Sequence, residues 1–78
     1  MSVEENVLEV VSRLLKYEIS DLSLETNLRK DLNADSIDSV EVIFELEDIY
    51  EIKIEDEVAE ELTTIGSIVD VITELTDN

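Results

Sequence analysis

Residues 35–50, DSIDSVEVIFELEDIY, contain the clearest helical pattern of the chain. Asp35 is a favourable N-cap, and Asp38 places a second carboxylate near the positive end of the helix dipole. Apolar residues then recur at steps of three and four, which is typical of an amphipathic helix. These apolar positions are Ile37, Val40, Ile43, Phe44, Leu46 and Tyr50. We therefore expect a helix that begins at Asp35 and Ser36 and ends near residue 50.

The segments before this helix are predicted to form another helix and a long loop. Ser2 and Glu5 have the spacing of a capping box, so a first helix should cover residues 3–16. Between residues 17 and 34, turn-forming residues interrupt the helical pattern. Apolar residues still recur there, at Ile19, Leu22, Leu24, Leu28 and Leu32. We therefore expect a long first loop that is pinned to the core.

The C-terminal third is predicted to add a short helix and a longer one. Residues 51–55 should form a loop with both isoleucines turned inward. Asp56 should cap a short helix through Glu61, and Thr64 should cap the last helix. Apolar residues keep a helical period in that last helix, at Ile65, Ile68, Val69, Ile72 and Leu75. The prediction is an all-α fold, a small four-helix bundle with three longer helices and one short one, forming a single domain over residues 1–78.

Composition excludes several classes of function. The 78 residues include 22 Asp or Glu but only 5 Lys or Arg, so the formal net charge is −17, and there is no His or Cys. Such a chain should bind neither nucleic acid nor an anionic membrane surface. We see no stretch long enough to span a bilayer, and residues 1–5 do not resemble a signal peptide. We expect a non-catalytic, monomeric, cytoplasmic protein without a metal site, with basic protein partners.

The acidic residues of the central helix form a continuous row. Its members follow steps of three, four and three residues: Asp38, Glu41, Glu45 and Asp48. Like charges at these spacings destabilise a helix by roughly 0.2–0.5 kcal/mol per pair. The row is either a solvated face that keeps a small protein soluble or a docking surface. Ile37, Val40 and Phe44 lie beside this row, and Val42 and Ile49 lie off the main apolar stripe. One helix in so small a domain cannot bury all five, so we expect some of them to face a partner.

The loop that leads into this helix imitates a calcium-binding loop without completing it. Asp31, Asn33 and Asp35 have the spacing of an EF-hand, but Ser36 stands where Gly is required and Val42 where Glu is required. We therefore expect no calcium site. Ser36 should be the first residue of the helix, where a phosphate on its oxygen would lie beside free backbone N–H groups. The alternative is that Ser36 is an ordinary polar residue near a helix start.

Residues 31–41, DLNADSIDSVE, resemble the attachment motif of the acyl carrier protein family, whose core is Asp-Ser-Leu. The resemblance continues through residues 47–65 and covers essentially the whole chain. In that family the serine of the motif carries 4′-phosphopantetheine, which implies covalent attachment at Ser36. The resemblance also implies that the terminal thiol of the arm holds acyl groups as thioesters. The implied partners are a phosphopantetheinyl transferase and acyl-processing enzymes with basic docking patches.

Two sets of site residues follow from these considerations. The docking set implied by the resemblance is Asp35, Ile37, Asp38, Val40, Glu41, Phe44, Glu47 and Asp48. The second set is a hypothesis that the core can part to shelter an acyl chain, which gains about 0.8 kcal/mol per buried methylene. This expected acyl pocket consists of Leu46, Tyr50, Ile54, Ala59, Leu62, Ile68 and Ile72.

The chain departs from the family pattern at several positions. Asn33 replaces the usual Gly, and Asn also tolerates a left-handed backbone. Tyr50 replaces the common Phe and should put a hydroxyl near the expected acyl pocket. Lys30 and Lys53 fall where relatives often carry acids that help to bind divalent cations, so those metal sites are not expected here.

Several functions remain open at this point. The acidity and small size favour a carrier for fatty acid biosynthesis over one for polyketide or peptide synthesis. From a different class, the chain could be a cofactor-free acidic adaptor that binds basic helices. A third function, an aspartate-based hydrolase, is supported only by the clustered carboxylates.

Overall fold

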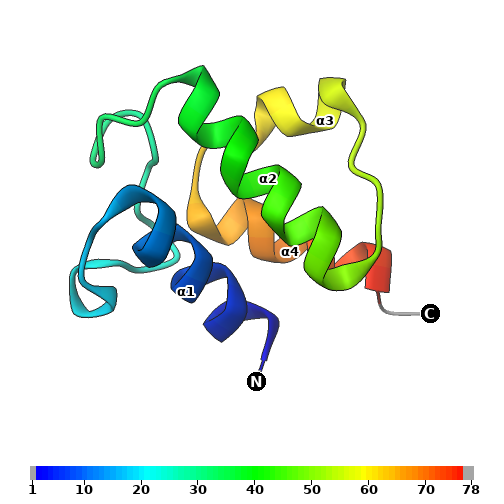
Figure 1. Ribbon diagram of the computed structural model, residues 1–78, viewed down its shortest axis with the longest axis horizontal. Coiled ribbons are helices and arrows are strands. Elements are labelled where there is room, and N and C mark those ends of the chain that lie inside the picture. Colours follow the sequence, from blue (N-terminus) through cyan, green and yellow to red (C-terminus); the bar gives the residue numbers. More distant parts are fainter. Residues whose placement is uncertain (1, 77–78) are drawn as a thin grey trace.

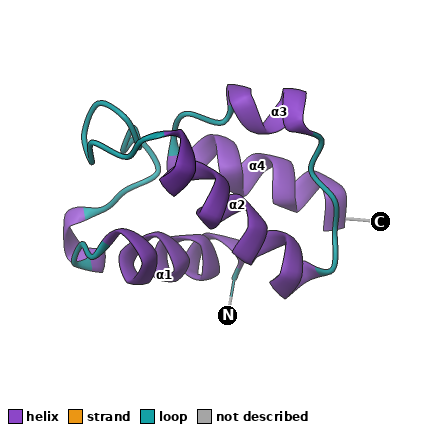
Figure 2. Cartoon of the chain, turned by 45° about the horizontal axis from the view of Figure 1, so that its top comes forward, coloured by secondary structure: helices purple, strands orange, loops and turns teal. Residues whose placement is uncertain are grey.

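In the computed structural model, residues 2–76 are described, and they form four α-helices and one 3₁₀ helix. In chain order these elements are α1 Val3–Leu15, η1 Ile19–Asp21, α2 Ser36–Tyr50, α3 Asp56–Glu61 and α4 Ile65–Thr76. Figures 1 and 2 show α2 running between α1 and α3, with α4 behind α2 in both views. The first helix, α1, packs against both α2 and α4. This arrangement confirms the predicted all-α bundle of three longer helices and one short helix.

The helix starts are fixed by side chains that satisfy free backbone N–H groups. The capping box predicted from Ser2 and Glu5 is present at the start of α1. At the start of α4, the Thr64 hydroxyl accepts a hydrogen bond of 3.1 Å from the Ser67 backbone N–H. These two predictions of helix starts are confirmed.

The prediction that Asp56 caps the short helix is wrong. Asp56 is the first residue of α3, and the cap position falls on Glu55, whose side chain makes no capping hydrogen bond. The start of α3 is set by Ile54, the residue before Glu55. Ile54 is buried and its backbone N–H donates a hydrogen bond to the Glu47 carboxylate, so the chain turns into α3 directly after this anchored residue. Ile52 is partly buried, so both isoleucines of this loop turn inward as predicted.

The core is aliphatic and is formed by α1, α2 and α4 together with residues of the connecting loops. Its buried members are Val7, Val10, Val11, Leu22, Leu28, Leu32, Ala34, Val42, Ile43, Leu46, Ile54, Leu62, Ile65, Ile68 and Ile72. Val42 is fully buried, so the expectation that it lies outside the buried stripe of the helix is wrong. Because α1 packs along α2, the helix buries a sector wider than one stripe. Ile49 remains exposed, as expected.

The long first loop is pinned to the start of α4 mainly through its backbone. Backbone hydrogen bonds join Leu28 to Thr63, Ile65 to Thr26 and Gly66 to Leu24, at 2.9, 3.1 and 2.8 Å. A Cβ at Gly66 would lie 2.9 Å from the Leu24 carbonyl oxygen, so this close approach requires glycine. The apolar residues of the loop divide into two groups: Leu22, Leu28 and Leu32 are buried, whereas Ile19 and Leu24 are exposed. The loop is therefore pinned to the core as predicted, but by three of its five apolar side chains rather than by all of them.

Candidate functional site

Ser36 is the first residue of α2, as predicted, and it is exposed. The helix start around it is held by a reciprocal pair of hydrogen bonds. The Asp35 carboxylate accepts from the Asp38 N–H at 2.9 Å, and the Asp38 carboxylate accepts from the Asp35 N–H at 3.3 Å. Asn33, which precedes this cap, has a φ of 56°, so the predicted left-handed backbone is confirmed. These contacts fix the backbone position of Ser36 at the helix start.

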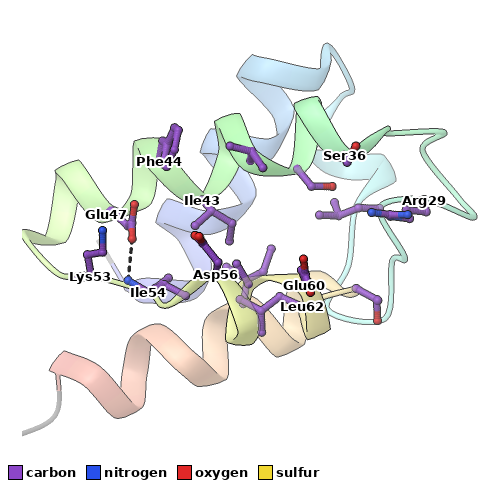
Figure 3. Close-up of a pocket in the computed structure, with 16 residues that line it drawn as sticks. Arg29, Ser36, Ile43, Phe44, Glu47, Lys53, Ile54, Asp56, Glu60 and Leu62 are labelled. Carbon is purple, nitrogen blue, oxygen red and sulfur yellow. Dashed lines mark hydrogen bonds between the residues drawn. The ribbon is translucent and has the colours of Figure 1, made fainter.

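A pocket of about 640 Å³ begins beside Ser36 and extends between α2 and α3. Its floor is aliphatic and is formed by Leu28, Ile43, Ile54, Leu62 and Ile68. Figure 3 shows Ser36 and Arg29 at one end of the pocket, and Glu47 and Lys53 at the other. On the α3 wall, Asp56 and Glu60 face the pocket together with Ala59. An exposed serine hydroxyl therefore opens onto an apolar cavity with charged ends.

The structure brings together four of the seven residues expected to form an acyl pocket. Those that line the cavity are Ile54, Ala59, Leu62 and Ile68. Leu46 and Ile72 are instead completely buried in the core and do not line the cavity. The Tyr50 hydroxyl accepts a hydrogen bond from the Asn6 side-chain amide of α1 at 2.6 Å, so it does not point into the expected pocket. Whether the cavity receives acyl chains stays a prediction.

The residues of the predicted docking set lie on the outer side of α2 or at its start. Four apolar side chains of this helix are substantially exposed: Ile37 at 68%, Phe44 at 63%, and Val40 and Ile49 at 45% each. Glu41 and Asp48 are also exposed, and Asp35 and Asp38 form the cap. Val40 and Phe44 additionally line the pocket. The outer side of α2 thus combines apolar and acidic groups next to Ser36.

Glu47, another member of the docking set, has a structural contact of its own. Its carboxylate accepts a hydrogen bond of 2.6 Å from the Ile54 backbone N–H, which closes the loop between α2 and α3 (Figure 3). In the acidic row, Glu45 pairs with Arg13 of α1 at 3.2 Å, the only ion pair within residues 2–76. The other carboxylates of the row are not neutralised in this way, so α2 presents strong negative charge to solvent.

Sequence reasoning missed several residues that line the pocket. Leu28 and Ile43 carry no signal that separates a pocket wall from an ordinary core position. Arg29 lies in a loop, and backbone hydrogen bonds of the adjacent Leu28 to Thr63 and to Ala34 place it near Ser36. No helical periodicity could indicate this contact.

Residues 2–76 contain neither a metal-binding cluster of side chains nor a helix that could span a membrane. No group of three or more acidic side chains in residues 2–76 is arranged to hold a metal ion. Within the same residues, no helix is both long enough and apolar enough to cross a membrane.

The family model described as phosphopantetheine attachment site matches residues 5–72. The chain belongs to this family. It is an attachment domain for covalently bound 4′-phosphopantetheine, in agreement with the resemblance to acyl carrier proteins. Carrier domains of this kind are generally non-catalytic, and they interact with transferases and acyl-processing enzymes.

The residues around the pocket of this phosphopantetheine attachment domain fit the group. A hydroxyl is needed for the phosphate linkage, and Ser36 offers one that is exposed at a fixed helix start. A path for the arm is also present, because the cavity with its aliphatic floor begins at the same serine. Arg29 supplies a positive charge at that end of the cavity.

Proposed function

We propose that Ser36 carries the 4′-phosphopantetheine arm and that the protein delivers acyl groups to partner enzymes. The observation that carries this proposal is the position of Ser36, which is exposed at the start of α2 and lines the end of a cavity of about 640 Å³. When bound, the group supplies the terminal thiol that takes up acyl groups, a function that no side chain of this cysteine-free chain can provide.

The outer side of α2 is the proposed docking surface for those enzymes. Its exposed apolar residues, Ile37, Val40 and Phe44, lie among carboxylates that include Glu41 and Asp48. Apolar contacts supply binding energy, whereas complementary charge speeds the encounter and makes it sensitive to salt. A partner with a basic and partly apolar surface would fit this arrangement. Fast, short-lived encounters of that kind suit a protein that visits several enzymes.

Fatty acid biosynthesis in the cytoplasm is the proposed setting, with the carrier acting as a monomer. The support is the net charge of −17, since electrostatic steering grows with the charge that a carrier presents. A carrier for polyketide or peptide synthesis would use the same chemistry at Ser36. The two settings differ in the acyl groups and partner enzymes rather than in this site.

A cofactor-free adaptor is the second candidate function. It is favoured by one observation, namely that the exposed apolar residues and carboxylates of α2 could bind a basic helix without any arm. This adaptor would not need Ser36, and replacing the serine by alanine would leave its binding intact.

The test is the intact mass of the protein after incubation with coenzyme A and a broad-specificity phosphopantetheinyl transferase. We expect a single phosphopantetheine adduct on the parent and none on Ser36→Ala. Ser39→Ala is the matched control, because Ser39 lines the same pocket but lies inside α2 rather than at its first position, and it should be modified like the parent. Thiol titration should then find one thiol per chain, since the polypeptide has no Cys.

An unmodified parent would contradict the proposal if it is folded and a known carrier is modified in parallel. An adduct that persists on Ser36→Ala would show that another residue carries the arm. The adaptor would remain in the first case, and the attachment residue would have to be reassigned in the second.

A further inference from the structure

Arg29 stands out because it is one of only five basic residues in a chain with a net charge of −17, yet it lines the pocket at the Ser36 end. Figure 3 shows its side chain at that end, with Lys53 at the opposite end. No carboxylate within residues 2–76 lies at ion-pair distance from Arg29. Its guanidinium is therefore available for another anion.

The backbone at Arg29 is held in a fixed place relative to Ser36. The Asn27 side chain accepts hydrogen bonds from the N–H groups of Arg29 and Lys30, at 3.0 and 2.9 Å. The neighbouring Leu28 is buried, and its carbonyl accepts a hydrogen bond of 2.9 Å from the N–H of Ala34, two residues before Ser36. The turn that carries Arg29 is thus tied to the chain that leads directly into α2.

The free N–H groups at the start of α2 favour a phosphate on Ser36, but nearby carboxylates oppose it, so a cation would add to its stabilisation. The carboxylates of Asp35 and Asp38 flank Ser36 in the helix cap, and both would repel a phosphodiester on the serine oxygen. Across the pocket, Asp56 and Glu60 of α3 add further negative charge. Among the residues that line this end of the pocket, Arg29 is the one that attracts an anion. A guanidinium also matches phosphate geometry through paired N–H donors.

We propose that Arg29 holds the phosphodiester of the arm on Ser36 and so directs the arm along the pocket rather than into solvent. Arg29 is then a positioning residue for the arm. This inference rests on the proposed attachment at Ser36, and it assigns to a loop residue a function that the attachment motif itself does not contain.

The test compares the ³¹P NMR signal of the phosphopantetheine-loaded parent with those of Arg29→Gln and Lys30→Gln. Lys30 is the matched control, because it is the adjacent basic residue in the same turn but does not line the pocket. Arg29→Gln should move and narrow the signal as the phosphate becomes mobile, whereas Lys30→Gln should reproduce the parent signal. The ratio of held to free phosphate should fall by about two- to fivefold, as for an exposed ion pair. Amide spectra of the unloaded proteins check that each variant is folded.

A salt series on the loaded parent tests the proposal without any variant. Between about 10 mM and about 1 M salt, the parent signal should shift toward that of Arg29→Gln, because salt screens an exposed ion pair. A parent signal that does not respond to salt would overturn the proposal. An Arg29→Gln signal that coincides with the parent signal would also overturn the proposal. Equal signal changes in Arg29→Gln and Lys30→Gln would overturn it as well, because they would reflect only the change in net charge. The mass adduct on Ser36 is established beforehand, so a failure here leaves the proposed function standing.

Discussion

The two sides of α2 contain the same kinds of apolar residue but place them in opposite environments. On the inner side, Val42, Ile43 and Leu46 are buried in the core. On the outer side, Val40 and Phe44 are exposed, although they lie within two residues of the buried ones. Burial of an aliphatic side chain stabilises a fold by about 1.5–3 kcal/mol, whereas an exposed one adds little. The inner side therefore holds the bundle together, and the outer side contributes little to folding.

This difference explains why a helix with so many apolar residues also carries so much charge. Exposed apolar groups promote association, and the carboxylates between them keep the surface soluble; under the proposed function they also favour basic partners. We interpret the outer side as a surface kept for the proposed partners rather than as a leftover of the core. The comparison can be tested by making equal changes on the two sides.

The largest difference in the free energy of unfolding is expected between Leu46→Ala and Phe44→Ala. Leu46 is fully buried, so its truncation leaves a cavity and should lower the free energy of unfolding by about 2–5 kcal/mol. Phe44 is exposed, and its truncation should cost less than about 1 kcal/mol. Urea unfolding followed by circular dichroism measures both values. Equal losses in the two variants would show that the outer side also supports the fold.

A smaller difference in the free energy of unfolding is expected between Val42→Thr and Val40→Thr. Both variants change a valine, at positions two residues apart. The hydroxyl introduced at the fully buried Val42 would lose water, and the cost should be about 1–3 kcal/mol. At Val40 the hydroxyl stays hydrated, and the change should lie within about 0.5 kcal/mol of the parent. Thermal unfolding at a single salt concentration compares the two variants. A Val40→Thr variant as unstable as Val42→Thr would contradict the assignment of the two sides.

Local rules predicted those parts of the fold that depend on neighbouring residues. The starts of α1 and α2 follow from short-range hydrogen bonds between side chain and backbone, as at Ser2 with Glu5 and Asp35 with Asp38. The left-handed backbone at Asn33 likewise follows from the residue type. The position of Ser36 at a helix start was predictable for the same reason.

Tertiary contacts decided what the sequence pattern could not predict. The full burial of Val42 depends on how α1 packs along α2, which periodicity in α2 alone does not reveal. Tyr50 turns toward Asn6 on another helix, and this contact removes its hydroxyl from the expected pocket. Arg29 lies at the pocket because the backbone of the adjacent Leu28 pairs with the distant Thr63, and no local sequence pattern predicts that contact. The lining of the pocket was therefore predicted only in part, although Ser36 at its end was named from the sequence.

The docking role proposed for the outer side of α2 is tested with one isoleucine on that side and one elsewhere. Ile37 and Ile19 are both exposed, but Ile37 lies on α2 and Ile19 on η1. The measurement is kcat/KM of a phosphopantetheinyl transferase for the parent, Ile37→Ala and Ile19→Ala, with unfolding followed on the same samples. We expect kcat/KM to fall by about five- to thirtyfold for Ile37→Ala and not at all for Ile19→Ala, with unchanged stability in both variants. Equal kcat/KM values for all three proteins would contradict the proposed docking role.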